Sequence, residues 1–132
     1  MGTRCLTFVY DENRQAIVNM YRQFDGYPSG HGAELAEFLN SIQAVTNGIL
    51  MGDKRKTANG MSCLAAQMIA QFKTDVGGFY LHPVSEKDCG QDYEYHVYHD
   101  RVTVFGYDRK HLFTGPWSTF LNFCKNPVVT EE

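Results

Sequence analysis

Two stretches near the start of the chain have the hydrophobic pattern of paired β-strands. Residues 4–10 are rich in aromatic and β-branched side chains, and residues 16–24 repeat this composition after the polar segment 11–15. Such residues favour extended strands, and a short polar segment between two runs of this kind is typical of a β-hairpin. The pattern therefore predicts an N-terminal hairpin.

Side-chain alternation suggests a register for this hairpin. If the even-numbered residues of both strands share one face, Tyr10 pairs with Ala16. Arg4 then lies opposite Arg22, and two like charges that face each other destabilise a sheet unless an anion or a carboxylate lies between them. The register thus predicts an anion-binding arginine pair. The alternative is that Arg22 is held by a structural carboxylate such as Asp25.

Three later segments have the periodicity of amphipathic helices. They cover residues 33–46, 61–72 and 115–126. Their apolar residues recur at spacings of three and four, which places them on one helical face. We therefore expect three helices that each bury one side.

Three further strands are expected after the second helix, at residues 79–82, 93–99 and 102–107, the last two forming a second hairpin. The predicted order is ββααβββα, with the strands clustered in hairpins. This order indicates an α+β fold, an antiparallel sheet built from hairpins with helices packed on one face. We expect a single domain over residues 1–127 and a short C-terminal tail at 128–132.

Composition agrees with a domain that has a sizeable core. The chain has 132 residues, of which 43% are hydrophobic and 14% aromatic. The formal charge of −3 argues against a protein that coats duplex nucleic acid or an anionic membrane through its overall field. No run approaches the roughly 18 apolar residues of a membrane span, and the N-terminus lacks a signal-peptide pattern, so we expect a cytoplasmic protein.

The segment Tyr21–Gly32, which joins the first hairpin to the first helix, is the most specific stretch of the sequence. It combines aromatic residues with charged residues, a proline and three glycines. A glycine-rich helix start can present backbone N–H groups to an anion, and its alternative is an ordinary turn with a capping role for Glu34. The predicted ligand-binding residues are Arg4, Arg22, Asp25, Tyr27, Ser29, Gly30, His31 and Gly32.

The five histidines lack the spacing of metal ligands. His96 and His99 on one strand point to opposite faces, and the sequence has no His-x-His or His-Glu-x-x-His motif. A nucleophile elbow and a Walker loop are also missing. We therefore predict no metal and no cofactor, and the catalytic alternative is His31 as a general acid or base. The basic segment Lys54–Lys56 is expected to be a solvated loop, with a flap over an anionic ligand as its alternative.

The start Met1–Arg4, the strand end Val9–Asp11 and the stretch Tyr21–Gly32 resemble a family of small phage, prophage and bacterial proteins. The similarity is specific over the N-terminal third of the chain. It implies a phage or mobile-element setting and favours a site formed by the arginine pair with Asp25 and His31. It implies no particular activity.

Small phage proteins include sponges that sequester immune signals, and this analogy supplies the first functional hypothesis. The hypothesis is a homo-oligomeric binding protein for a small anionic ligand, such as a cyclic-nucleotide or NAD-derived signal. Arg4, Arg22 and the Gly30–Gly32 helix start would hold phosphate, while Tyr27 and aromatic residues of the second hairpin would stack on a base. The alternatives are a metal-independent phosphodiesterase or related hydrolase that uses His31, and a protein-binding inhibitor of host defence.

Overall fold

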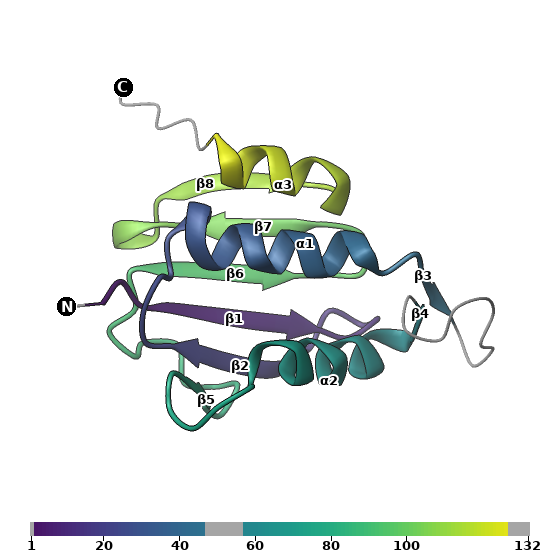
Figure 1. The fold of residues 1–132 in the computed structure, drawn as a ribbon, viewed down its shortest axis with the longest axis horizontal. Coiled ribbons are helices and arrows are strands. Elements are labelled where there is room, and N and C mark those ends of the chain that lie inside the picture. The colour runs from purple at the N-terminus through teal and green to yellow at the C-terminus, as the bar shows by residue number, and fades with distance from the viewer. Residues whose placement is uncertain (1, 47–56, 127–132) are drawn as a thin grey trace.

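The two N-terminal apolar runs form strands β1 (Cys5–Tyr10) and β2 (Ala16–Arg22), which pair as the predicted hairpin. The computed structural model describes residues 2–46 and 57–126 (Figure 1). The remaining strands are β3 (Ala44–Thr46), β4 (Thr57–Asn59), β5 (Phe79–Leu81), β6 (Tyr93–Val97), β7 (Val102–Phe105) and β8 (His111–Gly115). The helices are α1 (Ala33–Ser41), α2 (Gly60–Phe72) and α3 (Trp117–Lys125).

The main sheet has six strands in the order β5-β2-β1-β6-β7-β8. Neighbouring strands are antiparallel except β1 and β6, which are parallel. A parallel pair needs a long crossover, and the chain between these two strands supplies it with α1 and α2. The predicted α+β class is confirmed, and the two hairpins meet at this parallel pair, so the sheet is mixed.

All three helices lie on one face of the sheet (Figure 1). Their apolar sides and the strand residues beneath them form one hydrophobic core. The helices contribute Leu35, Leu39, Met61, Leu64, Met68 and Phe120, and the strands contribute Cys5, Val9, Met20, Tyr95, Val97, Val102 and Val104. The predicted helical stripes therefore face the sheet, as their spacing indicated.

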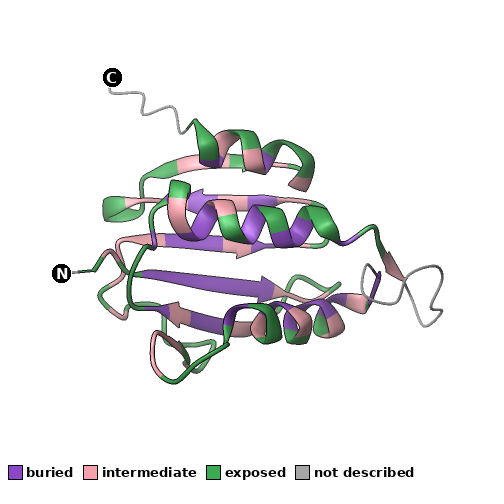
Figure 2. Cartoon of the chain, viewed as in Figure 1, coloured by how far each residue is buried: buried purple, intermediate pink, exposed green. Residues whose placement is uncertain are grey.

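The predicted register of the first hairpin is wrong at the Arg22 end. Tyr10 does pair with Ala16, but an irregularity between Val9 and Tyr10 shifts the remaining pairs, and Arg22 lies opposite Cys5. Alternation of polar and apolar residues could not reveal this, because β1 is buried on both faces (Figure 2). Its odd- and even-numbered residues are equally apolar in pattern, so the sequence does not show which set faces the helices. Arg4 therefore does not face Arg22.

Other boundaries also differ from those predicted. Helix α1 ends at Ser41 rather than near residue 46, because the chain becomes extended at Ile42 and then forms β3 beside β4. Strand β8 was not predicted, since its short sequence has little alternation and ends in the Gly-Pro pair that precedes α3. The predicted tail and the basic segment 54–56 lie outside the described residues.

Candidate functional site

Arg22 is the last residue of β2, and its side chain points into the helix-covered side of the sheet, where the residue is only 5% exposed. Its guanidinium lies over two aromatic rings, 4.8 Å from the centroid of Phe79 and 5.3 Å from that of Phe24. A guanidinium packs well on aromatic faces because its charge is delocalised over a plane. These rings hold the cation in one place.

Two carboxylates accompany this buried cation. Arg22 Nη1 donates to Glu34 Oε1 at 2.9 Å, and Nη2 lies 4.0 Å from Asp25 Oδ2. Both carboxylate side chains are 52% exposed, whereas the Arg22 side chain is 6% exposed. The structural carboxylate that the sequence left open as an alternative is therefore present, and its main contributor is Glu34 from the first turn of α1.

His31 lies behind Arg22 and has no exposed surface. Its Nδ1 is 3.2 Å from Arg22 Nη1, and its Nε2 is 2.7 Å from Thr7 Oγ1. An arginine can only donate, so Nδ1 accepts and the ring proton sits on Nε2, which donates to Thr7. Burial, and secondly the Arg22 charge, lower the pKa of His31 from 6.5 to about 3. His31 is thus a neutral, fixed support for Arg22.

The connecting segment bonds to itself rather than presenting free amides. After Asp25, which has a φ of 59°, the chain forms a π-helical turn, Pro28–Gly32, that leads into α1. The N–H groups of Gly30 and Gly32 donate to Tyr27, and that of His31 donates to the Asp25 carbonyl. The three amides of the predicted phosphate-holding helix start are therefore already engaged.

Close packing explains two of the glycines in this segment. A Cβ at Gly30 would lie 2.6 Å from the Asp25 carbonyl oxygen, and one at Gly32 would lie 2.9 Å from the Sγ of Cys124. Contacts this short are not tolerated. The glycines are needed to fit the segment against the chain's own atoms.

The other predicted site residues lie apart from Arg22. Arg4 is exposed near the β5–β6 connection, where its backbone N–H donates to Asp92 and its guanidinium lies beside Gly90. Tyr27 and Ser29 are exposed, and the Tyr27 hydroxyl donates to Asp25 at 3.3 Å. Of the predicted set, the structure brings together Arg22, Asp25 and His31.

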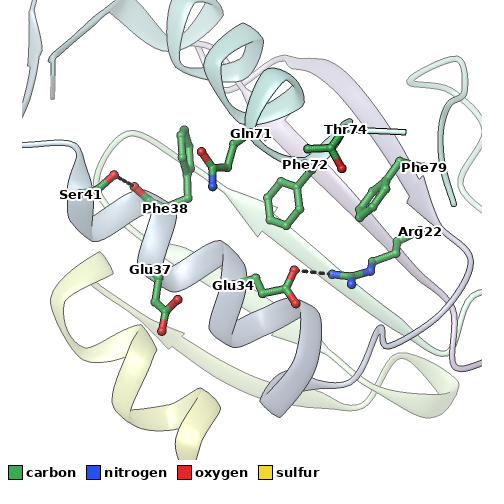
Figure 3. Close-up of a pocket in the computed structure, with 9 residues that line it drawn as sticks. All are labelled: Arg22, Glu34, Glu37, Phe38, Ser41, Gln71, Phe72, Thr74 and Phe79. Carbon is green, nitrogen blue, oxygen red and sulfur yellow. Dashed lines mark hydrogen bonds and ion pairs between the residues drawn. The ribbon is translucent and has the colours of Figure 1, made fainter. Parts of the chain in front are cut away.

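A cleft of about 590 Å³ opens over Arg22, between α1 and the end of α2 (Figure 3). Helix α1 supplies acidic and polar side chains, α2 and the segment after it supply polar and aromatic ones, and Arg22 forms part of the floor with Phe79. The lining residues are Arg22, Glu34, Glu37, Phe38, Ser41, Gln71, Phe72, Thr74 and Phe79. The cleft therefore offers one cation, two carboxylates and three aromatic rings to a ligand.

The aromatic residues of the second hairpin do not reach this cleft. Tyr95 is buried beside His31, with ring centroids 5.1 Å apart, and its hydroxyl donates to the Gly26 carbonyl. On the other face of the sheet, the rings of Tyr10 and Tyr98 stack at 4.4 Å, and Tyr10 also stacks on His96. These rings pack on one another and lie apart from the cleft, whose own aromatic lining is Phe38, Phe72 and Phe79.

Sequence reasoning missed most of the cleft. Phe38 and Phe72 were assigned to buried helical faces, and Glu34 was considered only for a capping box. Their contribution depends on the packing of α1 against the ends of α2 and β2, which are distant in sequence. The one available signal was Arg22 itself. It lies on the predicted apolar face of a strand, and a buried arginine requires a carboxylate partner somewhere in the fold.

Within residues 2–46 and 57–126, no group of three or more His, Cys, Asp and Glu side chains is placed to hold a metal ion. No helix in the same ranges has the length and apolar character needed to cross a bilayer.

Comparison of the chain with family models, with curated proteins and with solved structures finds no match.

Proposed function

We propose that the protein sequesters a small anionic, nucleotide-derived ligand in the cleft over Arg22. The observation that carries the proposal is a buried guanidinium on the floor of an open cleft, whose carboxylate partner Glu34 is half exposed. A volume of about 590 Å³ lies within the usual range for small-molecule sites. Phosphate oxygens suit the guanidinium because they pair with its N–H groups as a carboxylate does.

The rest of the lining supports a nucleoside portion beside the phosphate. Phe79 is half-buried and offers apolar surface for a base, and Phe72, whose ring centroid is 5.6 Å away, is buried behind the cleft wall. Glu37 and Gln71 offer hydrogen-bond acceptors and donors for sugar hydroxyls and base edges. A nucleotide needs each of these contacts.

The biological setting is proposed from other features. The resemblance of the N-terminal third to small phage and prophage proteins supports an anti-defence sponge that acts in the host cytoplasm. The exposed apolar residues Tyr80, Leu81 and Val84, within and just after the edge strand β5, support a homo-oligomer, since exposed apolar surface of this kind marks contact sites.

Binding is better supported than hydrolysis by His31. A general base must reach the proton that it removes, and His31 has no exposed surface and a partner on each ring nitrogen. The third hypothesis, a protein-binding inhibitor of host defence, is distinguished from the other two by the following test.

The test is incubation with a panel of cyclic mononucleotides, cyclic dinucleotides and ADP-ribose derivatives, followed by removal of free ligand, denaturation and chromatography. Recovery of an intact panel member is the expected result. Recovery of a cleaved product would instead support the hydrolase. Retention of no panel member would refute the proposal and favour a protein partner.

A further inference from the structure

Arg22 and Glu34 differ sharply in how firmly they are held. Arg22 is fixed between Phe24 and Phe79 and braced by His31, whereas the Glu34 side chain is half exposed on the first turn of α1. Water can solvate a half-exposed carboxylate that leaves its partner, so little is lost on the Glu34 side. The buried Arg22 charge would be costly if left unpaired, so Glu34 can leave when another oxyanion takes its place.

The Glu34 carboxylate also stands where an incoming oxyanion would bind. It accepts from Arg22 Nη1 at 2.9 Å and forms part of the cleft lining (Figure 3). The buried Arg22 Nε has no hydrogen-bond acceptor within the described part of the chain. A ligand in the cleft does not reach this buried atom, but the terminal Nη2 lies 4.0 Å from Asp25 Oδ2, beyond hydrogen-bond distance, so the guanidinium has a donor for a second oxygen there.

The charges that line the cleft limit what can replace Glu34. Of the described lining residues, Arg22 is the one cation, and Glu34 and Glu37 are both acidic. After an exchange, Glu34 remains attached to α1 beside the ligand, and the Asp25 carboxylate still lies 4.0 Å from Arg22 Nη2. Each negative charge beyond the first on a ligand therefore meets repulsion without a further cation to offset it.

We infer that Glu34 occupies the place of the ligand's anionic group and that the cleft selects phosphate esters with one negative charge, phosphodiesters, over those with two or more. The inference rests on the proposed function. A phosphodiester has two unesterified oxygens and a single charge, which matches one guanidinium. A phosphate monoester carries nearly two charges at pH 7.

The test uses two pairs of probes that share base and sugar and differ in phosphate charge. Cyclic AMP is compared with AMP, and cyclic GMP with GMP, by isothermal titration calorimetry at pH 7. The wild type should bind the diester of at least one pair more tightly than its partner. Glu34→Gln should tighten binding of that diester about two- to fivefold, as expected for loss of a half-exposed competing ion pair. The same substitution should tighten binding of the matching monoester by a larger factor.

Glu37→Gln is the matched control, because it removes the same charge from the cleft and leaves the Arg22–Glu34 pair in place. It should tighten binding of the diester less than Glu34→Gln does. If Glu34→Gln tightens no probe although Arg22→Met weakens binding, the inference is wrong and the proposed function stands. If the monoesters bind the wild type as well as the diesters do, the inference is also wrong. If no probe binds wild type or Glu34→Gln, the inference is wrong, and the proposed function is decided separately by the full panel, which also contains cyclic dinucleotides and ADP-ribose derivatives.

Discussion

Lowering the pH from 7 to 5 tests whether His31 is the buried, neutral support of Arg22. In the folded protein the pKa of His31 is lowered to about 3 by burial and by Arg22, whereas the unfolded chain has the ordinary value of 6.5. Between these two values the unfolded state binds more protons. The stability due to neutral His31 is therefore complete above about pH 6.5 and is lost as the pH falls toward 3.

The size of the effect follows from the two pKa values. Proton linkage at a single site with these values lowers the free energy of unfolding by about 2 kcal/mol between pH 7 and pH 5. This is a substantial part of the stability of an ordinary domain, which is about 5–15 kcal/mol.

The assay is urea unfolding of the wild type and of His31→Asn at pH 7 and pH 5, monitored by circular dichroism. Asparagine does not titrate, and its side-chain oxygen can replace Nδ1 as an acceptor for Arg22. The wild type should lose about 2 kcal/mol more than the variant over this range. Equal losses would refute the assignment. If the variant does not fold, NMR titration of the wild type decides, since the His31 ring should show no titration between pH 8 and pH 5.

Two other substitutions test the surroundings of the site. Tyr95→Phe removes a buried hydroxyl that donates to the Gly26 carbonyl at 2.8 Å and should lower the free energy of unfolding by about 1–3 kcal/mol in a denaturant titration; an unchanged midpoint would contradict this contact. Glu12→Ala removes a carboxylate that accepts from the Met61 N–H at 2.7 Å in the first turn of α2 and should cost about 1 kcal/mol in the same assay. An unchanged unfolding midpoint for Glu12→Ala would contradict this contact.

The sequence predicted the elements that depend on local pattern. The three helices and the strands of both hairpins follow from periodicity and turn residues, and these signals act over a few neighbouring positions. Strands β3, β4 and β8 were missed because their residues lack a strand-like alternation: β3 lies where the first helix was predicted to continue, and β8 ends in the Gly-Pro pair that precedes α3.

The candidate site shows where such patterns stop being informative. Arg22 was singled out because an arginine on the apolar face of a strand needs a partner, and the structure supplies Glu34. Its supposed partner Arg4 was wrong, because β1 is buried on both faces and a single irregularity beside Tyr10 changes which residue faces Arg22. Glu34 could not be identified as the true partner, since its position depends on how α1 packs over the end of β2.

The most direct test of the central claim compares the affinity of the wild type and of Arg22→Met for a panel member that the wild type retains. Equilibrium dialysis measures both affinities. Methionine keeps much of the packing between Phe24 and Phe79 but removes the charge and every N–H group. Arg101→Met is the matched control, because Arg101 pairs with Asp100 and does not line the cleft. A charge-assisted hydrogen bond contributes about 1.5–3 kcal/mol, so the account predicts a loss of affinity of about 10- to 150-fold for Arg22→Met and no change for Arg101→Met. Full affinity in a folded Arg22→Met protein would contradict it.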